Sequence, residues 1–306
     1  MPEPRPSRGG HPAPLLASFA LLAACTGVDE GRTDAEVEQL RLGRVHVVLD
    51  AGGTEADPDD FEVSARFAYV RGLDEDFVRA RIEMPVLAHD VLQAPDCIAS
   101  DQLVGSEGEA DGGDVQELVL VDAGDLRVDI GETRYDVPLS LVPDLLPYMS
   151  GVEYVMYSDE LPAIPVDGVS MAVTASGSQT DELPPFATEG HMPGALELSG
   201  PAEAGVVLRD DALALSWRAS DLADDTLTLR ITAMTGDEPT GSEITCLVPD
   251  VGEARLVLSS LRALGLASGG DAVRVEASRI ASSTFDAGDF AGSELVVERR
   301  ETTIVR

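Results

Sequence analysis

The chain has 306 residues, of which 44% are hydrophobic, and a formal net charge of −35. It is long enough to bury a sizeable core, and at about 150 residues per domain its length predicts two domains. So large a negative charge excludes nucleic-acid binding, because that binding depends on Lys and Arg neutralising phosphates. The sequence contains no Lys and no Asn, so Gly, Asp, Pro and Ser must form its turns.

The N-terminus begins with a basic stretch followed by a short apolar one. Arg5 and Arg8 precede an apolar run over residues 13–24. At about 1.5 Å per residue, a helix of that length is much shorter than the bilayer core of about 30 Å. Residues 1–24 therefore indicate a signal peptide rather than a membrane span.

The apolar run ends in Leu22-Ala23-Ala24-Cys25, which resembles the lipobox of bacterial lipoproteins. The resemblance implies cleavage before Cys25, a diacylglycerol on its thiol and an acylated amino group. Several acyl chains would attach the protein stably to a lipid bilayer. That family mostly places Asp after the Cys for retention at the inner membrane, and Thr26 stands there instead. We therefore expect the outer membrane of a Gram-negative bacterium, with the protein facing either the periplasm or the surface. An ordinary secretory signal is the alternative.

Beyond the signal, polar residues 25–42 are expected to form a flexible tether, and residues 43–183 a β-rich domain. Apolar and polar residues alternate over residues 61–69, the signature of a half-buried strand. Gly131-Glu132 is expected to form a hairpin turn. Further strands are predicted at residues 77–84, 117–122, 125–130, 133–137, 152–158 and 168–175.

Prolines and glycines in residues 184–194 predict a linker to a second domain, residues 195–306. Alternating runs about 8–12 residues apart in that second half are typical of an antiparallel β-sandwich. A short helix is expected at residues 259–265, with Ser259 as its cap. The expected fold class is thus mainly β, with two tandem antiparallel β-sandwich-like domains after a signal peptide and a short tether.

The second half also resembles a fibronectin type III or immunoglobulin-like sandwich. Leu213-Ala214-Leu215-Ser216-Trp217 is similar to the early strand that places a core Trp, and residues 273–277 are similar to a late strand. The aromatic residue that the family places at the start of that late strand would fall near Asp271, so the tyrosine corner is missing. Alternation places Trp217 on the same face as Leu213 and Leu215, so we expect it in the core.

Two cysteines remain after Cys25. Cys97 and Cys246 lie on opposite sides of the expected linker, and Cys246 falls within an apolar strand pattern. Buried single Cys residues behave as small hydrophobic groups, so we expect two buried thiols. A Cys97–Cys246 disulfide is the alternative, because such bonds persist outside the cytoplasm.

No arrangement of residues indicates catalysis. His46, His89 and His191 are far apart and lack the spacing of zinc ligands. His46 should point away from the core, toward solvent. Residues 168–172 match the letters of a nucleophile elbow, but the residues after Ser170 alternate as a strand rather than forming a helix. We therefore predict no enzymatic activity and no cofactor, with a hydrolase of unrecognised type as one alternative.

Calcium is the remaining candidate ligand, since hard cations bind several oxygen atoms. Two clusters concentrate carboxylates, and their members are Asp57, Asp59 and Asp60, and Glu107, Glu109 and Asp111. The second cluster begins like an EF-hand loop but has Leu118 where a bidentate Glu is required. We interpret both as solvated loops. The expected role is structural or protein-interaction, with an unknown protein partner, and a calcium-stabilised adhesion module is the other alternative.

Overall fold

The computed structural model describes the chain from residue 39 onward, with gaps. The described residues are 39–51, 60–84, 86–103, 116–142, 148–158, 162, 168–178, 180, 183–200, 212–220, 225–268 and 272–305. The chain divides into the units Met1–Glu36 and Val37–Arg306, and the described residues belong to the second. The expected signal peptide, Cys25 and most of the expected tether lie outside them.

The described chain is mainly β, as the sequence predicts. The strands are β1 Leu40–Ala51, β2 Asp60–Arg71, β3 Asp96–Ala99, β4 Glu117–Leu120, β5 Leu126–Ile130, β6 Thr133–Val137, β7 Leu139–Leu141, β8 Met149–Ser158, β9 Val169–Ala175, β10 Phe186–Met192, β11 Ala212–Ser216, β12 Thr226–Thr235, β13 Glu238–Pro249, β14 Glu253–Val257, β15 Ala272–Ala287 and β16 Phe290–Val305. The helices are α1 Glu75–Arg81, α2 Ala88–Val91, the 3-10 turn η1 Ser100–Gln102, and α3 Leu258–Ala263.

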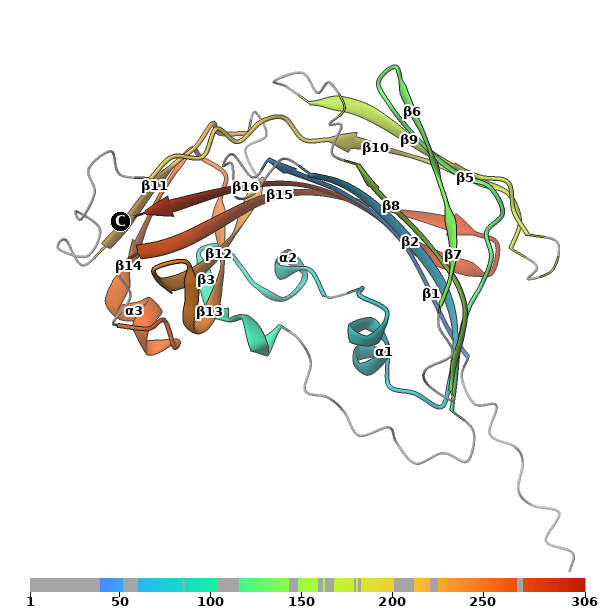
Figure 1. Ribbon diagram of the computed structural model, residues 1–306, viewed down its shortest axis with the longest axis horizontal. Coiled ribbons are helices and arrows are strands. Elements are labelled where there is room, and N and C mark those ends of the chain that lie inside the picture. Colours follow the sequence, from blue (N-terminus) through green and yellow to red (C-terminus); the bar gives the residue numbers. More distant parts are fainter. Residues whose placement is uncertain are drawn as a thin grey trace, which may run out of the picture. The chain divides into compact units, whose positions relative to one another are not determined.

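The described residues of this unit form three sheets. The largest has ten strands in the order β3-β13-β12-β15-β16-β1-β2-β4-β8-β7. A four-stranded sheet, β10-β9-β5-β6, covers its convex face, and α1 and α2 lie inside its curve (Figure 1). The pair β11-β14 forms the third sheet.

The expected division into two tandem domains is not what the structure shows. β1 pairs in parallel with β16, with Arg44 opposite Glu294, so strands from the two ends of the described chain are neighbours in one sheet. Residues 186–192 of the expected linker form β10 and pair with β9. Residues 40–42, the end of the expected tether, are the first residues of β1. Because the sheet runs through both halves, residues 43–183 and 195–306 fold together.

Apolar side chains from the ten-stranded sheet pack against each smaller sheet. Val45, Val47 and Phe67 belong to a core shared with β5, β9 and β10. Leu213, Leu215 and Trp217 belong to a second core between β11-β14 and the end of the large sheet near β13, so the predicted core position of Trp217 is confirmed.

A third core lies on the concave face, where the predicted strand at residues 77–84 is instead helix α1. The carboxylate of Asp74 caps α1 by accepting hydrogen bonds from the backbone N–H groups of Asp76 and Phe77. Glu75 and Arg79 form an ion pair one turn apart. These local interactions outweigh the alternation, and Val78 of α1 packs into the core.

Two local predictions can be compared directly with the structure. The hairpin at Gly131 is confirmed, since β5 pairs with β6 and Gly131 has a φ of 56°, a conformation that glycine adopts readily. The short helix of the second half is also present as α3. Its cap residue is Val257 rather than Ser259, and no side chain caps it.

Candidate functional site

Beside the third core, the concave face of the ten-stranded sheet carries charged side chains on β1, β12, β15 and β16, where the other face is apolar. Because side chains alternate along a strand, β1 directs Val45 and Val47 into the core, and Arg44 and His46 to the concave face. On β16, Glu298 lies on the same concave face. The registers align these positions, since Glu298 is opposite Val48 of β1 and Ile280 of β15.

Glu298 is the centre of a buried ionic cluster. Its side chain is 4% exposed, and it accepts two hydrogen bonds from Arg300, of 2.8 Å from Nε and 2.9 Å from Nη2. Arg300 lies two residues along the same strand and so on the same face. His46 Nε2 lies 3.1 Å from Glu298 Oε2. His46 is opposite Val296, so it reaches Glu298 along a diagonal between strands.

Burial and charge act in opposite directions on the pKa values of this cluster. Burial on its own raises the pKa of Glu298, but hydrogen bonds from His46 and Arg300 outweigh it and hold that pKa well below 4.5. Burial lowers the pKa of Arg300, yet the bonds to Glu298 raise it above its usual value. The neighbouring Glu62 has a raised pKa because it is desolvated by burial. The cluster therefore holds Glu298 and Arg300 as a charged pair.

Further cross-strand ion pairs lie on this face, among them those of Arg44 and Arg230. Arg44 donates to its partner Glu294, with a 2.7 Å bond from Nε. Arg230 of β12 lies opposite Glu276 of β15, and its Nη1 is 3.0 Å from Glu276 Oε1. Arg300 Nε is 4.0 Å from the same Glu276 oxygen, so two guanidinium groups converge on one carboxylate.

A segment that crosses this face, which we call the strap, comprises residues 72–84 and 86–103 and contains α1, α2, β3 and η1. At its far end a disulfide joins Cys97 to Cys246, which are directly opposite in the β3–β13 pair. Nearby, Ser100 Oγ lies 2.7 Å from Thr245 Oγ1. The expectation of two separate thiols is therefore wrong. The antiparallel pairing of β3 with β13, invisible to local sequence patterns, brings the two sulfur atoms together.

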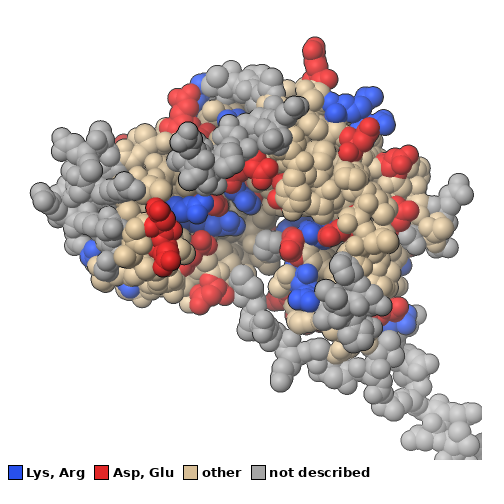
Figure 2. All heavy atoms as spheres, viewed as in Figure 1, with Lys and Arg blue, Asp and Glu red and all other residues tan. Residues whose placement is uncertain are grey.

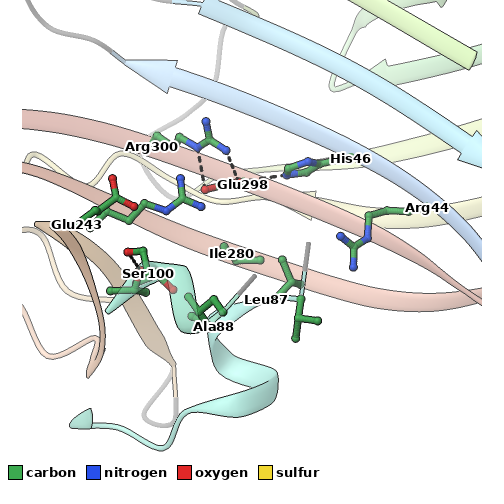
Figure 3. Close-up of a pocket in the computed structure, with 14 residues that line it drawn as sticks. Arg44, His46, Leu87, Ala88, Ser100, Glu243, Ile280, Glu298 and Arg300 are labelled. Carbon is green, nitrogen blue, oxygen red and sulfur yellow. Dashed lines mark hydrogen bonds and ion pairs between the residues drawn. The ribbon is translucent and has the colours of Figure 1, made fainter. Parts of the chain in front are cut away.

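Between the strap and the sheet lies a cavity of about 170 Å³, which we call the cleft. Figure 3 shows the chain of Arg300, Glu298 and His46 on the strand side, with Leu87 and Ala88 of the strap facing them. Val86 and Leu103 add apolar surface from the strap. The face seen in Figure 2 is hollowed near its middle, and both Arg and acidic side chains lie along the hollow.

The structure places the predicted histidines apart from one another. His46 points away from the core as expected, but the expected solvent-facing position is wrong, because the strap covers it and its side chain is only 19% exposed. His89 lies in α2, and His191 is an exposed residue of β10. Ser170 is exposed in β9, which confirms its position on a strand.

Most of the calcium candidates cannot be placed. Asp57, Asp59, Glu107, Glu109 and Asp111 lie outside the described residues, and Asp60 is exposed at the start of β2. Within the described ranges, no three His, Cys, Asp or Glu side chains are grouped so as to hold a metal ion. Among those same residues, no helix has the length and apolarity to cross a membrane.

The ionic cluster at Glu298 is not among the features predicted from the sequence. Alternation alone indicates that His46 shares a face with Arg44, and that Glu298 and Arg300 share a face. Neither the β1 sequence nor the β16 sequence contains a local signal for the parallel register that brings these two pairs together. Comparison with known proteins supplies no further guide, since no family model matches the chain and no curated protein matches it.

Proposed function

We propose that this protein is an exported lipoprotein, held to the outer membrane of a Gram-negative bacterium by acyl chains on Cys25. Its folded part serves a binding role, structural or protein-interacting, rather than a catalytic one. The polar residues that follow Cys25 would connect the anchor to the folded part, which begins with β1 near Leu40.

The disulfide between Cys97 and Cys246 is the observation that carries the proposal. It links positions 149 residues apart, and it fastens the strap to β13. Disulfides of this kind form and persist in oxidising compartments such as the periplasm and the cell surface, whereas the cytoplasm keeps thiols reduced. An exported location therefore agrees with both the leader and the cross-link.

The chemistry of the cleft supports binding over catalysis. Glu298 stays ionised because its pKa is held low, so it has no proton to give as a general acid near neutral pH. Ser100 Oγ is hydrogen-bonded to the hydroxyl of Thr245 rather than to a general base. Groups held in ion pairs on rigid strands are well suited to recognising a ligand.

Mass spectrometry of the native protein tests the anchor. We expect an N-terminal peptide that begins at Cys25 and carries a diacylglyceryl group and an amide-linked acyl chain. Cys25→Ser should lose both groups and leave the membrane fraction or retain its leader, whereas the matched control Thr26→Ser should remain acylated. An unmodified Cys25 thiol, or a leader still attached to the native protein, would overturn the anchor.

The exported location has its own measurement. Alkylation of unfolded protein without reductant should leave Cys97 and Cys246 unlabelled, and reduction should expose both. If both cysteines were labelled in protein taken directly from cells, the argument from the disulfide would be lost.

A further inference from the structure

The cleft under the strap has the size and chemistry of a binding site for one small molecule. Its volume of about 170 Å³ is close to that of cavities, about 150 Å³, that hold a benzene molecule. A ligand that fills it therefore has roughly six to eight non-hydrogen atoms. Strands β1, β12, β13, β15 and β16 form one wall, and the strap forms the other.

The strand side of the cleft offers hydrogen-bond donors for an anion. Arg230 and Arg300 both line it, and their side chains are 39% and 24% exposed. Glu276 draws the two guanidinium groups toward one point, at 3.0 and 4.0 Å. Each guanidinium carries five N–H donors, and the bonds made among the described residues use only part of each set. A carboxylate can accept hydrogen bonds from the remainder.

The charged groups around the cleft are close to balanced. Three Arg side chains and two Glu side chains line it, and Glu276 and Glu294 pair with two of those Arg residues from outside the lining. One of those acids, Glu298, is almost fully buried against Arg300 and His46, so its charge is compensated. The net charge of −35 repels anions in proportion to their charge, so a ligand with one negative charge is repelled less than a polyanion.

The strap supplies the apolar side of the cleft. Val86, Leu87 and Leu103 line it, opposite the charged residues of the sheet. We propose that the cleft binds a small monocarboxylate with an aliphatic body, its carboxylate held by Arg230 and Arg300 and its hydrocarbon part packed against Leu87 and Leu103. This inference goes beyond the proposed anchoring and does not depend on acylation of Cys25.

Calorimetric titration of the full-length protein, purified from whichever cell fraction holds it, tests the proposal. The probe is isovalerate, with the neutral isovaleramide and the cationic isopentylamine as matched ligands of the same shape. We expect saturable binding of isovalerate only. Binding of the amine or the amide as tight as that of isovalerate, or no saturable binding of isovalerate at millimolar concentrations, would overturn the proposal.

Variants locate the site. Arg230→Gln should weaken isovalerate binding about tenfold or more, because a charge-assisted bond is lost. The matched control Arg255→Gln removes the same charge from an exposed position on β14, outside the cleft, and should leave the affinity unchanged. If the two variants bound isovalerate with equal affinity, the assignment of the binding site to the cleft would be overturned. Circular dichroism melts of both would show that the fold is intact.

The apolar side is tested separately. Leu87→Ala should weaken isovalerate binding about fivefold, because a buried apolar contact is removed, and should leave acetate binding unchanged. Equal losses for the two ligands would overturn the assignment of the hydrocarbon part to the strap. None of these titrations involves Cys25. A failure to bind isovalerate would therefore not contradict the anchoring proposal, and an unmodified Cys25 would not contradict ligand binding in the cleft.

Discussion

The two faces of the ten-stranded sheet are built from the same strands but in opposite ways. On β1, Val45 and Val47 belong to an apolar core, whereas Arg44 and His46 belong to the charged concave face. Both faces are largely covered, one by the four-stranded sheet and the other by the strap (Figure 1). Alternation of polar and apolar residues therefore marks two different environments here, rather than a core and a solvated surface.

The difference shows what each face contributes. Apolar packing is non-directional and tolerates many partners, so the convex face supplies stability. Charges removed from water are stabilising only when each is paired with good geometry, so the concave face must be specified residue by residue. Removing these charges from water costs free energy of folding, which is one reason to propose that ligand binding takes place on this face.

The largest expected effect is on the apolar face. Phe67 is fully buried, and its ring lies 5.4 Å from that of Phe186 and 5.9 Å from that of Phe290. Phe67→Ala should lower the free energy of unfolding by about 4 kcal/mol, because it leaves a cavity. Urea denaturation measures this. Leu141→Ala, at a position 77% exposed, is the control and should change it by less than about 0.5 kcal/mol.

The next effect removes the centre of the charged face. Glu298→Gln removes the buried negative charge that Arg300 and His46 contact and should cost about 3 kcal/mol of unfolding free energy. The control is Glu132→Gln in the exposed hairpin turn, which should cost almost nothing. If both variants unfolded alike, the cluster would not differ from a solvated surface.

The same variant gives a pH signature. The pKa of Glu298 is lower in the folded protein than its ordinary value of 4.5, so its contribution to stability is complete above about pH 4.5 and is lost as the pH falls through the folded pKa. The difference in unfolding free energy between wild type and Glu298→Gln should therefore shrink as the pH falls below about 4.5. A difference that grew over that acidic range would contradict the assignment.

A smaller effect is expected from releasing the strap. Replacing both Cys97 and Cys246 with Ala should lower stability by about 2–3 kcal/mol, because the cross-link no longer restricts the unfolded chain. Limited proteolysis should then cut within residues 72–103 faster than elsewhere. Wild-type protein treated with reductant should behave as the double variant does, and unchanged cleavage would show that the strap is held without the disulfide.

The smallest effect concerns the acidic residues outside the cleft. We expect the melting temperature to be the same with calcium as with chelator, because solvated carboxylates such as Asp60 bind hard cations weakly unless several converge. Differential scanning calorimetry measures this. A rise in the midpoint with calcium would instead support the calcium-stabilised adhesion module.

Much of the local structure could be predicted because it depends on neighbours in the chain. Alternation correctly indicated the strands around residues 61–69 and the core position of Trp217. The same signal was wrong for residues 77–84, where capping by Asp74 and the Glu75–Arg79 pair favour helix α1. Capping residues before an alternating segment were thus the better evidence there.

What the sequence determined by itself was the mainly β class of fold and the alternating faces of each strand. Only the tertiary structure decided which strands are neighbours, and with that the single continuous sheet, the Cys97–Cys246 bond and the ionic cluster at Glu298. The physical reason is that the side-chain period is local to a strand, whereas register between strands depends on the packing of the whole chain. The cleft exists because β1 lies beside β16, with Arg44 opposite Glu294, 250 residues along the chain.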